Sequence, residues 1–102
     1  MVPRYIRNAN GATENYLSAR LENAMVKGAS GFSRTLYGYA NTTLPGMVMR
    51  VYRPGEETSA YAFRSTDSDV VSGSVFFDKV GDWKVVLVGT GSLSFTYIVR
   101  IV

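Results

Sequence analysis

From residue 32 to the C-terminus, apolar and polar side chains alternate with a period of two. Such alternation places one set of side chains on each face of a pleated strand. Glycine, proline and small polar residues interrupt it at regular intervals, which is typical of antiparallel sandwiches and barrels. The pattern predicts strands over residues 35–40, 47–53, 58–64, 71–77, 83–88 and 93–102.

The segments between these strands carry residues with defined turn preferences. Asn41–Gly46 should end the first run, because Pro45 removes a ladder donor and Gly46 suits the third position of a type II turn. Val80–Asp82 should turn the chain again. The short segment Gly89–Ser92 predicts a hairpin loop that fixes the register of the last two strands.

Residues 13–27 are compatible with two structures. Thr13 can cap a helix and Gly28 can end one, and apolar residues recur between them at helical spacing. Residues 16–21 also alternate in steps of two. We favour a first strand around residues 20–27, because the rest of the chain is β, and the helix stays open as the alternative.

The first dozen residues are polar and end in the turn signal Asn10–Gly11. They hold too few apolar side chains to dock firmly on their own domain, so we expect an extended arm that a neighbouring subunit would hold. The sequence thus predicts an arm over residues 1–19 and one all-β domain over residues 20–102. That domain should be an antiparallel β-sandwich, immunoglobulin-like or jelly-roll, of about seven strands.

The last strand becomes apolar on both faces at its C-terminal end. Such a strand lies either in the centre of a sheet or under another chain. Together with the arm, it supplies the candidate interface residues, which are Arg4, Tyr5, Ile6, Arg7, Ile98, Ile101 and Val102.

The amino-acid composition excludes several classes of function. The 102 residues include no cysteine and no histidine, which removes disulfide scaffolds, zinc sites and His-based catalytic sets. We expect no enzyme activity, no cofactor and no metal. No apolar run approaches the roughly 20 residues of a membrane span, and the N-terminus lacks the apolar region of a secretory signal, so we expect synthesis in the cytoplasm and no membrane partner.

Charge is unevenly placed along the chain. Residues 1–53 carry seven basic and two acidic side chains, a net charge of +5, whereas residues 54–102 carry four basic and six acidic ones, a net charge of −2. This asymmetry suits head-to-tail contacts between copies or an acidic partner surface, although solvated side chains alone could also explain it. The basic residues do not cluster, so nucleic acid is not an expected partner.

Two further sets of side chains are candidate sites. Asp67 and Asp69 could ligate calcium, but no third acid stands close by, so solvation of a loop explains them better. Aromatic residues are numerous, with seven tyrosines, five phenylalanines and one tryptophan. A platform for sugars or another ligand could use Tyr37, Tyr39, Tyr52, Tyr61 or Trp83.

Four segments carry a family resemblance: Asn23–Gly31 with its Val-Lys-Gly, Leu36–Thr42 with Leu-Tyr-Gly, Val48–Tyr52, and Gly81–Gly89. Over residues 20–102 the chain resembles small β-sandwich structural proteins of tailed bacteriophages, and residues 1–19 have no counterpart. The resemblance implies a non-enzymatic virion protein, either a capsid decoration (cement) protein or a head-tail or tail-associated subunit. Its expected partners are a major capsid or tail protein and copies of itself. A carbohydrate- or ligand-binding β-sandwich module is the alternative.

Overall fold

The computed structural model describes residues 4–7, 16–21, 31–90 and 93–101, and within the first two of these ranges it describes the side chain of Leu17 only. This part of the chain contains eight strands and no helix. The strands are β1 (Arg4–Arg7), β2 (Tyr16–Leu21), β3 (Phe32–Leu44), β4 (Met47–Tyr52), β5 (Tyr61–Ser65), β6 (Ser68–Phe77), β7 (Gly81–Val88) and β8 (Ser94–Ile101).

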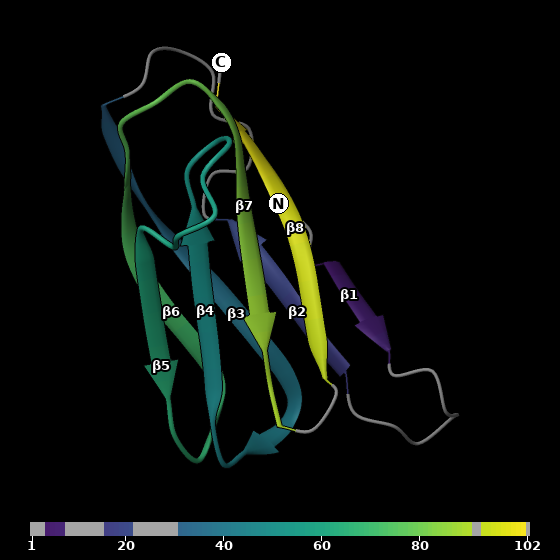
Figure 1. The fold of residues 1–102 in the computed structure, drawn as a ribbon. Coiled ribbons are helices and arrows are strands. Elements are labelled where there is room, and N and C mark those ends of the chain that lie inside the picture. The colour runs from purple at the N-terminus through teal and green to yellow at the C-terminus, as the bar shows by residue number, and fades with distance from the viewer. Residues whose placement is uncertain (1–3, 8–15, 22–30, 91–92, 102) are drawn as a thin grey trace.

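The strands form two antiparallel sheets that pack face to face (Figure 1). Sheet A has the order β1-β2-β3-β6, and sheet B has the order β5-β4-β7-β8. The chain passes from one sheet to the other after β3, after β5 and after β6. The predicted all-β, antiparallel, sandwich-like architecture is therefore confirmed.

Alternation along the strands builds the core between the sheets. In β8, Phe95, Tyr97, Val99 and Ile101 are buried, whereas the residues between them are exposed. Alternate residues of β4 and β7 are also buried, with half-buried or exposed residues between them, and the buried set meets that of β3 and β6 from the opposite sheet. Burial of these apolar side chains is the main stabilising contribution to the fold.

The N-terminal part differs from the prediction. β2 spans Tyr16–Leu21, so the segment is a strand there and not a helix, and it crosses the predicted boundary between residues 19 and 20. Leu17 is fully buried, because the alternation of residues 16–21 turns it toward the core. Arg4–Arg7 pairs with β2 as an edge strand of sheet A, which makes one strand more than the predicted seven. The rest of the predicted arm and strand residues 22–27 lie outside the described residues.

The turn predicted over Asn41–Gly46 is also different. Residues up to Leu44 continue β3 with a register shift after Tyr39, so the connection to β4 shrinks to Pro45–Gly46. Gly46 is not among the described residues with positive φ, so the type II turn predicted there is wrong. Such a turn does occur at Gly55, where φ is 76° and Glu56 N donates to Arg53 O over 3.1 Å.

The last strand is at the edge of sheet B, where β7 is its one partner among the described strands. The alternative that placed it in the centre of a sheet is wrong. Ile101 is 1% exposed, because it belongs to the inward set, so it is a core residue and not a surface one. Ile98 points outward and is 51% exposed, and Val102 lies outside the described residues.

Within the described ranges, no helix has the length and apolar character needed to cross a membrane.

Candidate functional site: the outer face of sheet B

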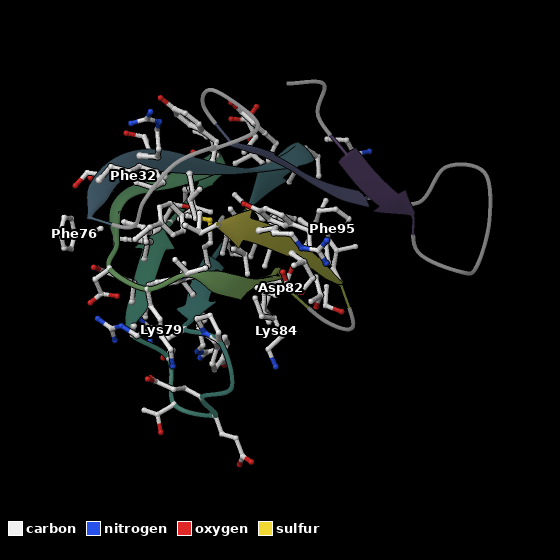
Figure 2. The ribbon with its side chains drawn as sticks, turned by 90° about the horizontal axis from the view of Figure 1, so that it is seen from above. Phe32, Phe76, Lys79, Asp82, Lys84 and Phe95 are labelled. Carbon is white, nitrogen blue, oxygen red and sulfur yellow. The ribbon has the colours of Figure 1, made fainter. Side chains whose placement is uncertain are left out.

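The outer face of sheet B combines basic and apolar side chains. We call this surface the basic face. It consists of the outward residues of β4, β5, β7 and β8, namely Val48, Arg50, Tyr52, Ala62, Arg64, Asp82, Lys84, Val86, Val88, Ser94, Thr96, Ile98 and Arg100. Their alternate neighbours point into the core, as Figure 2 shows for Phe95, whereas Lys84 points away from both sheets.

Strand register arranges these residues in rows across the sheet. Val48 lies between Arg64 on β5 and Val88 on β7. Arg50 lies beside Val86 in the next row. Directly opposite residues on one face are in contact distance in antiparallel pairs, so Arg64 and Arg50 each have an apolar neighbour.

A further row extends the same pattern toward the free edge. It runs from Tyr52 through Lys84 to Ile98, and the Lys84 ammonium lies 4.8 Å from the centre of the Tyr52 ring. The long side chains of lysine and arginine cover apolar surface with their methylene groups while the charge stays in water. Half-buried valines and the exposed Ile98 therefore form apolar strips between cations.

Charge on the basic face is mostly of one sign. It carries four cations and one carboxylate, Asp82, which forms an ion pair with Arg100 over 2.8 Å. Among the described side chains, the other ion pair is Arg53–Asp78, so Arg50, Arg64 and Lys84 have no carboxylate partner there. A face whose unpaired charges are positive and which carries apolar strips is complementary to an acidic surface.

The outer face of sheet A differs from the basic face. The paired positions of β3 and β6 carry Ser, Thr, Tyr, Val and Phe side chains and no charge. Tyr37 and Tyr39 stack on each other with ring centres 6.1 Å apart. Phe76 projects from the edge strand and is 46% exposed (Figure 2).

A network at one end of the molecule ties the β4–β5 connection to the β6–β7 connection. Arg53 donates from Nε and Nη2 to the two carboxylate oxygens of Asp78, each over 2.9 Å. The guanidinium also lies 5.7 Å from the centre of the Trp83 ring. Trp83 Nε1 donates to Lys79 O over 2.8 Å. Because the Arg53 guanidinium, the Asp78 carboxylate and the Trp83 N–H each have a partner within the fold, this network stabilises the corner.

We expect the Arg53–Asp78 pair to make stability depend on acid pH. The hydrogen bonds from Arg53 lower the pKa of Asp78 below its ordinary value. A lowered pKa in the folded state contributes stability that is present above the unfolded value of about 3.9 and is lost as pH falls through the folded value. In thermal melts from pH 7 down to about pH 2, Asp78→Asn should melt below the wild type at pH 7. The two melting curves should converge in acid.

Asp82→Asn provides the matched control for this prediction. Arg100 lowers the pKa of Asp82 by the same kind of hydrogen bond. The Arg100–Asp82 pair is more exposed, at 69% and 50% against 30% and 35% for Arg53–Asp78, so solvent screens it more. Asp82→Asn should therefore lower the melting temperature at pH 7 by less than Asp78→Asn does. Equal melting temperatures of Asp78→Asn and the wild type at pH 7 would contradict the stabilising role of the corner.

The aromatic residues named as alternatives for a ligand platform lie in different parts of the fold. Tyr61 faces inward, and its hydroxyl accepts from Phe76 N over 3.2 Å, which covers part of the edge of β6. Trp83 is completely buried. Tyr37 and Tyr39 share the outer face of sheet A, whereas Tyr52 is on sheet B, so only the first two remain as a platform.

Other potential chemistry is also limited in the described part of the chain. Asp67 and Asp69 do not belong to any group of three or more acidic, histidine or cysteine side chains there that could hold a metal ion. Burial raises the pKa of the Tyr97 hydroxyl, so this group stays protonated at neutral pH.

Of the predicted interface residues, the structure places Arg4–Arg7 at the edge of sheet A and Ile98 on the basic face. Sequence reasoning missed Arg50, Arg64 and Lys84 as one surface. Each stands at an outward position of its strand, and this parity was readable from the alternation. Their grouping needs the strand order, which the alternation does not contain.

No family model matches the sequence, and the search of curated proteins finds no significant match.

Proposed function

We propose that the chain is a non-enzymatic structural subunit that binds neighbouring protein subunits, and that it serves in the virion of a tailed phage. The observation that carries the first part is the basic face, where three cations without ion-pair partners in the described chain alternate with half-buried valines and Ile98. The resemblance of residues 20–102 to phage β-sandwich proteins supports the second part. A decoration (cement) or head-tail or tail-associated position fits both.

The strand order supports the immunoglobulin-like alternative over the jelly roll. β3 pairs with β6 and β4 with β7, as strands B with E and C with F do in immunoglobulin-like sandwiches. β8 continues from β7 as strand G continues from F, and β5 lies beside β4 as a C′ strand does. Trp83, near the start of β7, bonds back to the backbone at Lys79, much as the corner tyrosine of such domains does.

Physical arguments favour a protein partner for the basic face. Flat sheet faces pack well on other protein surfaces, and the apolar strips supply area to bury there. A surface for single-stranded nucleic acid would call for several exposed aromatic rings between the cations, whereas the described basic face has Tyr52 alone. The cations of the basic face would select an acidic partner and increase the rate of association.

Co-purification tests the proposed function. The tagged chain, produced during infection by the phage that encodes it, should be recovered with assembled particles and cross-link to a major capsid or tail protein. Arg50→Glu with Lys84→Glu should reduce this recovery at least tenfold, because the changes reverse charge at the centre of the contact. Tyr37→Ala on the opposite sheet should leave recovery unchanged. Absence of the wild-type chain from particles would overturn the virion assignment.

A carbohydrate- or ligand-binding module is the second candidate, and the stacked Tyr37–Tyr39 pair favours it. Two adjacent rings on an uncharged face can stack against the apolar face of a sugar. Calorimetric titration with a glycan panel should then give binding that Tyr37→Ala abolishes and Arg50→Glu preserves. Fluorescence of Trp83 would not report on this site, because Trp83 is buried in the core.

A further inference from the structure

Four carboxylates of the described chain have no ion-pair partner in it. The six described acidic side chains include Asp78 and Asp82, which pair with arginines. The remaining four are all exposed, and they are Glu56, Glu57, Asp67 and Asp69. They lie at the two ends of β5, in or next to its connections to β4 and to β6. The basic face and these carboxylates are therefore complementary charges that the described chain leaves unpaired.

Backbone hydrogen bonds hold both ends of the β4–β5 connection, which carries Glu56 and Glu57. The type II turn at Pro54–Gly55 and the hydrogen bond from Glu56 N to Arg53 O fix the first half of the loop. Ala60 N donates to Val51 O over 2.8 Å and fixes the return to β5. Such support lowers the conformational entropy lost when the loop is bound.

The direction of this loop is favourable for contact between molecules. Figure 2 shows the β4–β5 connection projecting beyond sheet B, on the side to which Lys84 points. The loop therefore stands out from the basic face. Within its own chain Lys84 lies over Tyr52, and neither Glu56 nor Glu57 forms an ion pair with a described cation.

We propose that the β4–β5 loop of one copy docks through Glu56 and Glu57 onto the basic face of a second copy, against Arg50 and Lys84. This inference rests on the proposed function, because it names a second copy as one partner of the same face. The apolar strip around Val86 supplies the buried area between the charges. Charge complementarity within one sequence favours a second copy over an unrelated acidic protein.

The contact should be weak and sensitive to salt. Exposed ion pairs contribute little individually, and raising ionic strength from about 0.05 M to about 0.5 M shortens the screening length about threefold. Sedimentation velocity of the purified chain from about 10 µM to 1 mM, the range expected for weak contacts, should show the mean mass rising with concentration at low salt. The same series at high salt should stay close to the monomer mass.

Charge reversal identifies the contact. Glu56→Lys with Glu57→Lys should weaken self-association at least tenfold, and so should Arg50→Glu with Lys84→Glu. An equimolar mixture of the two variants should associate again, because one supplies the native loop and the other the native face. All four changes are at surface positions, so circular dichroism should be unchanged.

Asp67→Lys with Asp69→Lys is the matched control, because it alters charge equally at the opposite end of β5. It should leave self-association within twofold of the wild type. A monomeric chain at every concentration in low salt, an equal loss in this control, or no recovery on mixing would each overturn the contact between copies. If the contact between copies fails but recovery of the chain with particles still depends on Arg50 and Lys84, the proposed function stands without that contact.

Discussion

Replacing Trp83 with alanine should lower the free energy of unfolding by about 3–5 kcal/mol, the cost of removing a buried aromatic ring. The ring is completely buried and meets Phe77 edge to face, with centroids 5.0 Å apart. Its N–H bond to Lys79 O joins the β6–β7 connection to the core. A domain of this size has about 5–15 kcal/mol of stability in total, so the variant should be marginally folded. Urea denaturation followed by far-UV circular dichroism measures the loss.

Two variants separate the contributions at this site. Trp83→Phe keeps an aromatic ring in the core but removes the N–H donor, so it should lose less than Trp83→Ala. Phe76→Ala removes an aromatic side chain that is already 46% exposed, and should change stability by about 0.5 kcal/mol or less. A Trp83→Ala midpoint equal to that of Phe76→Ala would contradict the central place of Trp83 in the core.

The face that each strand turns to the core could be predicted from the sequence where alternation is uninterrupted. In β8, every second residue from Phe95 to Ile101 is apolar, and those residues are the buried ones. Period two follows from the pleat alone and needs no knowledge of neighbours. The ends of strands are predicted less accurately. Gly81 and Asp82 belong to β7, although the sequence predicts a turn at Val80–Asp82.

The edge position of the last strand could not be predicted, because it depends on tertiary pairing. Residues Ile98–Ile101 are mostly apolar, which fits a central strand as well as an edge strand. In the structure Ile98 is left exposed on the outer face, and Arg100 pairs with Asp82 beside it. The alternation settles which residues turn inward, but not whether another strand follows.

The grouping of the cations on the basic face depends even more on the order of the strands in the sheet. Arg50, Arg64 and Lys84 are on β4, β5 and β7, and the chain leaves sheet B for β6 between the last two. Turn residues indicate where a strand ends but not which strand it will pair with after a crossing. The uneven charge along the chain pointed to contacts with copies or acidic partners, and the strand order shows on which surface the cations gather.

The difference between the predicted N-terminal boundary of the domain and the observed start of β2 has another cause. The segment before residue 20 has few apolar residues, and low apolar content favours an arm. A strand that pairs with strands on both sides needs few buried side chains, because backbone hydrogen bonds to its neighbours and one core residue can hold it. Leu17 is that residue in β2, and β2 pairs in register with β3 from Leu17↔Ala40 to Leu21↔Leu36.

Gly38, in the centre of the sandwich, should be one of the least replaceable of the described strand glycines. It is on β3, and a Cβ there would lie 2.5 and 2.9 Å from the two δ-methyl carbons of Leu87 in the opposite sheet. Gly38→Val should therefore cost about 2–3 kcal/mol through overpacking. The higher strand propensity of valine offsets at most about 1 kcal/mol of steric cost. Urea midpoints measure the net effect.

A second substitution tests whether the cost arises from this cross-sheet contact. Leu87→Ala alone should lose about 2–5 kcal/mol, because it opens a cavity above Gly38. In the double variant the valine fills part of that cavity, so the total loss should fall short of the sum by about 1–3 kcal/mol. Gly46→Ala, where a Cβ meets nothing within 4 Å, should be neutral or slightly stabilising. Simple additivity of Gly38→Val and Leu87→Ala would show that the two sheets do not interlock at this point.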